Sequence, residues 1–154
     1  MSTGRVVEVL SREGCEELLS RAEIGRVVLT AQAMPTALPV NYAFDGKDIV
    51  FRTGSGTKLA AAKNGTVVAF EVDDFEPALR IGWSVVATGV ATTVTDPVEL
   101  AQVETLGIGT WVDSREGQYI RLHPEFLTGR RISLRHESAS HDGHRRRPPE
   151  ATNS

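Results

Sequence analysis

Residues 38–53, LPVNYAFDGKDIVFRT, decide the fold class of this chain. From residue 38 to residue 44 large apolar side chains alternate with small or polar ones, which is the period of a strand with one buried face. The side chains expected on that face are Leu38, Val40, Tyr42 and Phe44. Asp45-Gly46 is typical of a tight type I′ hairpin turn, so residues 48–53 are expected to return antiparallel. The stretch therefore predicts a β-hairpin.

Segments on both sides of this hairpin also have β-type patterns. They are residues 26–30, 66–72, 81–95, 118–123 and 126–134. Met34-Pro35 is interpreted as a turn, and Gly89 inside the longest segment indicates a bulge or bend. About seven short strands joined by hairpin turns favour an antiparallel barrel over a doubly wound parallel sheet.

Helices are expected in only three places. Residues 11–22 have an apolar stripe at helical spacing, and Ser11 can cap their first turn. A second helix is expected from Asp96-Pro97 to about Leu106, because aspartate is a good cap and proline suits the first helical position. Residues 57–64 are expected to form a short third helix. The fold class is thus mainly β with a few short helices.

Length and composition indicate one globular domain with a tail. The chain has 154 residues, of which 40% are hydrophobic and 24% charged, as is ordinary for a globular protein. From about Ser138 onward the sequence has no aliphatic periodicity and is rich in serine, proline and arginine. We therefore expect a folded domain over residues 1–137 and a disordered tail over residues 138–154.

Charge and cysteine content exclude several classes of protein. The net charge is −3, and the basic cluster Arg145–Arg147 lies in the tail, so no extended face for nucleic acid is expected. The single cysteine, Cys15, excludes an internal disulfide and suits a reducing compartment. No apolar run approaches the ~20 residues of a membrane span. The expectation is a cytoplasmic protein with no nucleic-acid or membrane partner.

Residues 51–59, FRTGSGTKL, carry the groups that hold a phosphate. A strand delivers Arg52 and Thr53, two glycines follow, and Thr57 and Lys58 open a helix whose unpaired N–H groups favour an anion. The spacing of a Walker loop and that of a dinucleotide fingerprint are both absent. From these residues alone, a polar turn before a capped helix is the competing interpretation.

Six motifs together resemble the pyridoxamine 5′-phosphate oxidase-like family. They are GRVVL at 25–29, LPVNYAFDG at 38–46, IVFRTGSGTKL at 49–59, VAFEVD at 68–73, GWSVVATGVA at 82–91 and TGRRI at 128–132. The resemblance runs from about Arg12 to Ile132 and is strongest to the short flavin-nucleotide-binding branch. It implies an antiparallel split β-barrel of the FMN-binding type.

The resemblance also implies a cofactor site. The flavin ring is expected against the strand at 37–42, whose backbone groups would read the ring edge. The residues expected at the ring and ribityl chain are Pro39, Val40, Asn41 and Tyr42, and those expected at the phosphate are Arg52, Thr53, Thr57 and Lys58. A homodimer would complete the site, with Trp83 and Ser84 supplied by the partner subunit. Packing in a core or an interface is an equal alternative role for Trp83.

Departures from the family restrict the function. The chain is too short for the segment that holds substrate phosphate in true pyridoxamine phosphate oxidases. Arg130 and Arg131 are the only paired arginines before the tail, with either a structural role or a role at a cofactor phosphate. No metal site is expected, because His136, His141 and His144 lie in or beside the tail. The acidic residues at 73–76 are interpreted as a solvated turn, and Cys15 as a buried, inert thiol.

The expected function is an FMN-dependent oxidoreductase that acts on a small molecule. No catalytic residue is assigned, because the flavin performs the chemistry; Tyr42 or Tyr119 could donate a proton. The alternatives are a flavin carrier or sensor without turnover, or a deazaflavin- or haem-binding member of the same fold. His123 is the candidate axial ligand to haem and is otherwise interpreted as a strand-end residue.

Overall fold

The computed structural model describes residues 4–54, 65–110 and 117–135. These residues form eight strands and two helices. The elements are β1 (Arg5–Val9), α1 (Arg12–Leu19), β2 (Ile24–Ala31), β3 (Met34–Phe44), β4 (Ile49–Thr53), β5 (Thr66–Glu76), β6 (Ile81–Thr93), α2 (Pro97–Glu104), β7 (Gln118–Leu122) and β8 (Phe126–Leu134). The predicted helix at 57–64 and the predicted tail at 138–154 lie outside the described residues.

Six strands close into an antiparallel barrel. Their order is β6-β5-β2-β3-β4-β7, and β7 pairs back onto β6 to close the ring. Every strand pair is antiparallel. The predicted antiparallel split β-barrel is therefore confirmed. A strand missed by the sequence analysis, β1, lies outside the barrel beside β8.

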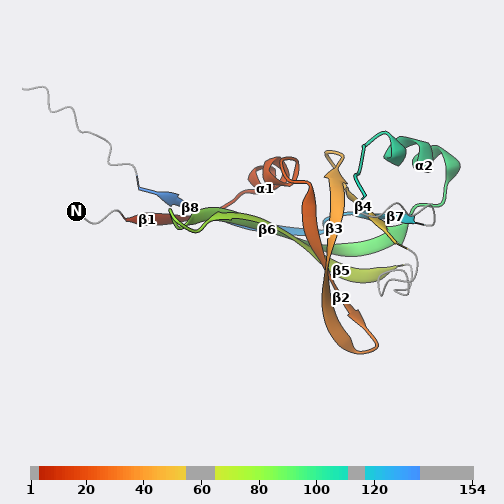
Figure 1. Ribbon diagram of the computed structural model, residues 1–154, viewed down its shortest axis with the longest axis horizontal. Coiled ribbons are helices and arrows are strands. Elements are labelled where there is room, and N and C mark those ends of the chain that lie inside the picture. The colour runs from red at the N-terminus through yellow and green to blue at the C-terminus, as the bar shows by residue number, and fades with distance from the viewer. Residues whose placement is uncertain (1–3, 55–64, 111–116, 136–154) are drawn as a thin grey trace, which may run out of the picture.

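The sheet continues beyond the barrel as an extension that we call the wing: β1, β8, residues 73–76 of β5 and residues 81–88 of β6. It exists because β6 is 13 residues long and changes partners along its length. The first part of β6 pairs with β8 from Gly82 to Thr88, and the last part pairs with β7 from Ala91. In Figure 1 the wing runs to the left of the barrel, and α1 lies on one of its faces.

Gly89 lies where β6 changes from one partner to the other. A Cβ atom at this position would lie 2.1 Å from the backbone oxygen of His123. Of the predicted bulge or bend, the bulge is absent from the pairing of β5 with β6, because the register passes through the Val68–Gly89 pair without an extra residue. The glycine instead permits a close backbone approach at the barrel closure.

Two predicted turns differ from the structure. Met34 and Pro35 belong to β3, and the turn before them is made by Gln32 and Ala33, whose φ angles are 51° and 60°. The loop after β3 spans residues 45–48, two residues longer than a type I′ turn. The Asp45 side chain stabilises this loop by accepting hydrogen bonds from the backbone N–H groups two and three residues further on, Lys47 at 2.9 Å and Asp48 at 2.6 Å.

The core fills the barrel and continues under α1. The Phe70 ring meets the Tyr42 ring edge-on at 4.9 Å between centroids and stacks with Phe51 at 6.0 Å. Cys15, on the inner side of α1, is completely buried, as predicted. A smaller cluster of Val50, Val94 and Val103 lies between α2 and the barrel.

Both described helices begin as predicted. The side chains of Ser11 and Asp96 accept hydrogen bonds from backbone N–H groups in the first turns of α1 and α2. In residues 4–54, 65–110 and 117–135, no helix is long and apolar enough to cross a membrane.

Candidate functional site

The predicted ring strand presents its side chains to two opposite faces. Val40 packs against the core and Tyr42 is only 4% exposed, whereas Pro39 is exposed and Asn41 is half-buried on the outer face. A ligand on the outer face can therefore touch the side chains of Pro39 and Asn41. It can reach Val40 and Tyr42 through backbone atoms alone.

Tyr42 is tied into the core by its hydroxyl group. The hydroxyl donates a hydrogen bond to the backbone oxygen of Leu19 at 2.6 Å. Burial raises the pKa of the Tyr42 hydroxyl far above its ordinary value. The geometry therefore gives Tyr42 a role in attaching the end of α1 to the barrel, and it is poorly suited to proton donation.

One edge of β3 is open along the predicted ring segment. β3 pairs with β2 from Met34 to Asn41, but with β4 only from Tyr42 to Phe44. Within the described part of the chain, residues 37–40 thus have a partner strand on one side. On their other side, these residues have no partner among the described strands.

Arg52 and Thr53 also point to opposite faces. Thr53 is 4% exposed, and its hydroxyl donates to the backbone oxygen of Gln118 at 3.4 Å inside the barrel. Arg52 lies on the outer face. Tyr42 with Phe51 is the last β3–β4 pair at this end, and Asn41 and Arg52 are the next residues along the two strands. One predicted ring residue and one predicted phosphate residue therefore directly follow the same strand pair.

The Arg52 side chain lies beside two residues: Tyr119 on β7 and Gly117, just before β7. Its Cζ lies 5.5 Å from the centroid of the Tyr119 ring, in cation–π geometry. A Cβ on Gly117 would lie 2.6 Å from Arg52 Nε. A larger residue at 117 would therefore displace the cation. Thr57 and Lys58, the other predicted phosphate residues, lie outside the described residues.

Ser84 and Trp83 lie on different faces of the wing. Ser84 faces outward, paired with Asp73 of β5 and Arg130 of β8. It is separated from Asn41 by β2 and β5, which at the usual strand spacing is about 14 Å. One chain therefore does not bring Ser84 to its own Asn41, and contribution by a partner subunit stays a prediction.

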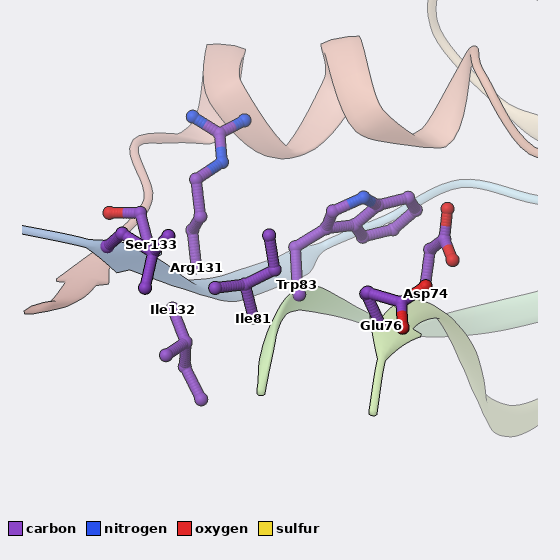
Figure 2. Close-up of a pocket in the computed structure, with 9 residues that line it drawn as sticks. Asp74, Glu76, Ile81, Trp83, Arg131, Ile132 and Ser133 are labelled. Carbon is purple, nitrogen blue, oxygen red and sulfur yellow. The ribbon is translucent and has the colours of Figure 1, made fainter. Parts of the chain in front are cut away.

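Trp83 lines a groove on the face of the wing that carries α1. The groove has a volume of about 430 Å³, and Figure 2 shows the Trp83 indole between the side chains of Arg131 and Asp74. These two residues pair with Trp83 from β8 and β5. Arg130, by contrast, is exposed on the outer face. The two consecutive arginines therefore serve different surfaces.

The sequence analysis missed a charged cluster on the outer face, which we call the Arg26 triad: Arg26, Glu71 and Asp73. Arg26 Nη1 lies 3.1 Å from Glu71 Oε2 and 3.2 Å from Asp73 Oδ2. Burial raises the pKa of Glu71 to about 7; a hydrogen bond to Asp73 and its charge act in the same direction, and Arg26 opposes them. The residues are far apart in sequence, so only the strand register reveals the cluster.

A second missed cluster joins the loop at 45–48 to the end of β7. Arg121 Nη1 lies 2.9 Å from a carboxylate oxygen of both Asp45 and Asp48. The pKa of Asp45 is lowered, because hydrogen bonds from backbone N–H groups and Arg121 outweigh its burial. His123 Nδ1 lies 2.7 Å from the other Asp48 oxygen. His123 directly follows β7, so it is the strand-end residue that the sequence predicts. As a candidate haem ligand, it has its Nδ1 atom in contact with Asp48. In residues 4–54, 65–110 and 117–135, no three His, Cys, Asp or Glu side chains form a group that could hold a metal ion.

Comparison with known proteins gives one family and several relatives. Residues 11–131 match the family described as pyridoxamine 5′-phosphate oxidase. An uncharacterised protein of Mycobacterium tuberculosis is 38% identical over 135 residues, which cover 84% of this chain and 88% of that protein. The structure of an FAD binding protein from Mycobacterium smegmatis is 35% identical, with a TM-score of 0.73, and covers 80% of this chain and 97% of that one.

A more distant structure shares the fold alone. It is the FAD and haem binding protein from Mycobacterium smegmatis, which is 18% identical with a TM-score of 0.62. The alignment covers 80% of this chain and 71% of that protein.

Proposed function

The chain belongs to the pyridoxamine 5′-phosphate oxidase family, and from that premise we propose that it binds a flavin nucleotide, with FMN as the recognised unit. The observation that carries the proposal is that Asn41 and Arg52 directly follow the Tyr42–Phe51 pair, beside the edge of β3 that has no partner among the described strands. A ring-binding segment and a phosphate-binding cation then lie one strand apart. The likeness to the FAD binding protein supports a flavin dinucleotide as well as FMN.

The described residues fit such a ligand. Pro39 and Asn41 offer a small surface for the ring, and backbone groups of β3 offer hydrogen bonds to its edge. The Arg52 guanidinium, placed by Tyr119 and given room by Gly117, would neutralise the phosphate. Thr57 and Lys58 are proposed to complete the anion site.

The proposed activity is oxidoreduction of a small molecule. Bound FMN would supply hydride or electron transfer, while the protein supplies docking, orientation and electrostatics. This division agrees with the position of Tyr42, whose hydroxyl is engaged inside the core. Vitamin B6 oxidation is not proposed, because Arg130 and Arg131 point to opposite faces of the wing and do not form a joint phosphate site.

We propose that the working unit is a homodimer formed through the outer face of the wing. A row of side chains crosses four strands there through the pairs Val7–Ile132, Ile132–Gly82 and Gly82–Phe75. Val7 is 61% exposed and Phe75 50% exposed. A second copy would cover this apolar row, and we propose that its Ser84 contributes to the ring site.

Equilibrium titration with FMN and riboflavin tests the proposed cofactor. Arg52→Ala removes the cation at the phosphate, so FMN affinity is expected to fall about 10–100-fold while riboflavin affinity hardly changes. Lys58→Ala is expected to behave in the same way. Lys47→Ala, which removes an exposed cation in the loop at 45–48, is the matched control and should leave both affinities unchanged.

Equal losses for FMN and riboflavin would contradict the phosphate assignment. Turnover is tested separately by mixing the reduced, FMN-loaded protein with a panel of small electron acceptors. An oxidoreductase should reduce one class of acceptor much faster than free reduced FMN does. Rates equal to those of free FMN for every acceptor would leave the carrier or sensor as the function.

A further inference from the structure

The Arg26 triad lies on the outer face between the proposed ring segment and the strand that carries Ser84. Arg26 pairs with Pro39 on one side and with Glu71 on the other, and Asp73 pairs with Ser84. The triad is therefore one strand away from the proposed flavin. A three-ring system on Pro39 and Asn41 would be wider than the ~5 Å between strands, and on the side of β2 it would reach Arg26.

Arg26 is the cation nearest to this surface among the described residues of β2, β3 and β5. Its side chain is 55% exposed, and its Nη1 atom contacts both carboxylates. The residues that face the triad from the neighbouring strands are the uncharged Pro39, Asn41, Ser84 and Val86, with Arg130 one strand further away on β8. The local charge is therefore set by one guanidinium and two carboxylates.

The number of protons on those two carboxylates decides the net charge of the triad. Burial, together with the neighbouring Asp73 carboxylate, raises the pKa of Glu71 to about 7. Below about pH 7 the Glu71 carboxyl is protonated. As the pH rises through about 7 this carboxyl ionises, and the triad gains one negative charge.

We propose that Arg26 raises the reduction potential of the bound flavin and that the Glu71–Asp73 pair makes this effect depend on pH. The inference rests on the proposed flavin site. When an external reductant such as dithionite is oxidised, the flavin takes up two electrons and one proton, and the reduced ring gains a negative charge. A guanidinium beside the ring stabilises that charge, whereas a second ionised carboxylate opposes it.

Potentiometric titration of the FMN-loaded protein tests the proposal. Arg26→Gln should lower the ratio of reduced to oxidised FMN affinity about tenfold, which is about 30 mV for a two-electron couple. Arg26→Lys keeps the charge and should recover most of this loss. Arg21→Gln removes an exposed cation at the end of α1 and is the matched control, with no change expected.

The pH arm uses Glu71→Gln. Above pH 7 this variant lacks the negative charge that the wild-type triad carries, so its potential should be higher there, with an affinity ratio raised about threefold. Well below pH 7 the two proteins should agree. Glu8→Gln, a carboxyl change on the exposed strand β1, should follow the wild type at every pH.

A second measurement requires no flavin. The folded pKa of Glu71 is raised to about 7 from 4.5, so the folded state holds a proton that the unfolded state releases. Stability from this proton is complete below pH 4.5 and is lost as the pH rises through about 7. Glu71→Gln should therefore remove that loss in urea unfolding.

Three outcomes separate the ideas. Unchanged potentials in Arg26→Gln and Glu71→Gln, with FMN still bound, would overturn the role of the triad and leave the proposed cofactor standing. A wild-type protein that takes up no flavin would overturn both. A lower potential in Arg26→Gln and a Glu71→Gln difference confined to high pH would support the proposal.

Discussion

The barrel and the wing belong to one continuous sheet but bury their side chains differently. In the barrel, each strand pairs with a neighbouring strand on both sides, so the sheet closes into a ring. Inside it, Phe51, Phe70 and Val72 are inaccessible to solvent. In the wing, α1 covers one face, while the outer face exposes Val7 and Phe75. The barrel is therefore closed within one chain, whereas the outer face of the wing exposes the apolar row that we propose a second copy covers.

The largest expected difference between the two regions is in the cost of removing an apolar side chain. Phe70→Ala should lower the free energy of unfolding by about 3–5 kcal/mol, because it empties the middle of the barrel core. Val7→Ala on the wing should change it by less than about 0.5 kcal/mol in the monomer. Urea unfolding at low protein concentration measures both. Similar losses would contradict the distinction.

Closure of the barrel should be sensitive to a single methyl group. Gly89→Ala places a Cβ against the backbone oxygen of His123, which cannot move aside as a side chain would, so a loss of about 1–3 kcal/mol is expected. Gly109→Ala is the matched control, because no atom lies within 4 Å of its added Cβ. Equal stability of the two variants in urea would show that the strands do not meet as closely as described.

The smallest effect on unfolding is expected from Val7→Asp, yet this change should alter assembly most. An exposed aspartate costs the monomer little, but it would place a charge within the apolar row that we propose pairs with a second copy. Sedimentation should therefore show monomers where the wild type forms dimers. If Val7→Asp sediments like the wild type, the outer face of the wing is not the interface.

Local signals explain why much of the barrel could be predicted from the sequence. The alternating pattern at 38–44 identified a strand with one buried face. The caps Ser11 and Asp96 were recognisable because each bonds a backbone N–H group in the helical turn that directly follows it. The strand β1 was missed because all five of its residues are exposed, so it has no alternating pattern. The turn at Gln32 and Ala33 was missed because neither residue is glycine or asparagine, the usual turn formers.

The candidate site was predictable only in part for a different reason. Sequence motifs identified Asn41 and Arg52, but the alternation of strand faces decides which predicted residues can act through side chains. Thr53 and Tyr42 proved to face inward. In the Arg26 triad, Glu71 lies 45 positions and Asp73 lies 47 positions after Arg26 in the sequence. No local sequence pattern reveals contacts over such separations. Such contacts follow from the register of β2 with β5.

We propose that two copies of this chain hold a flavin nucleotide between the barrel of one and the wing of the other. Sedimentation velocity of the protein mixed with FMN, detected in the visible absorption band of the flavin, tests it most directly. We expect flavin absorbance that moves at the mass of a dimer and that disappears from this boundary in Arg52→Ala. Flavin that stays behind as free ligand, or that moves with a monomer, would contradict it.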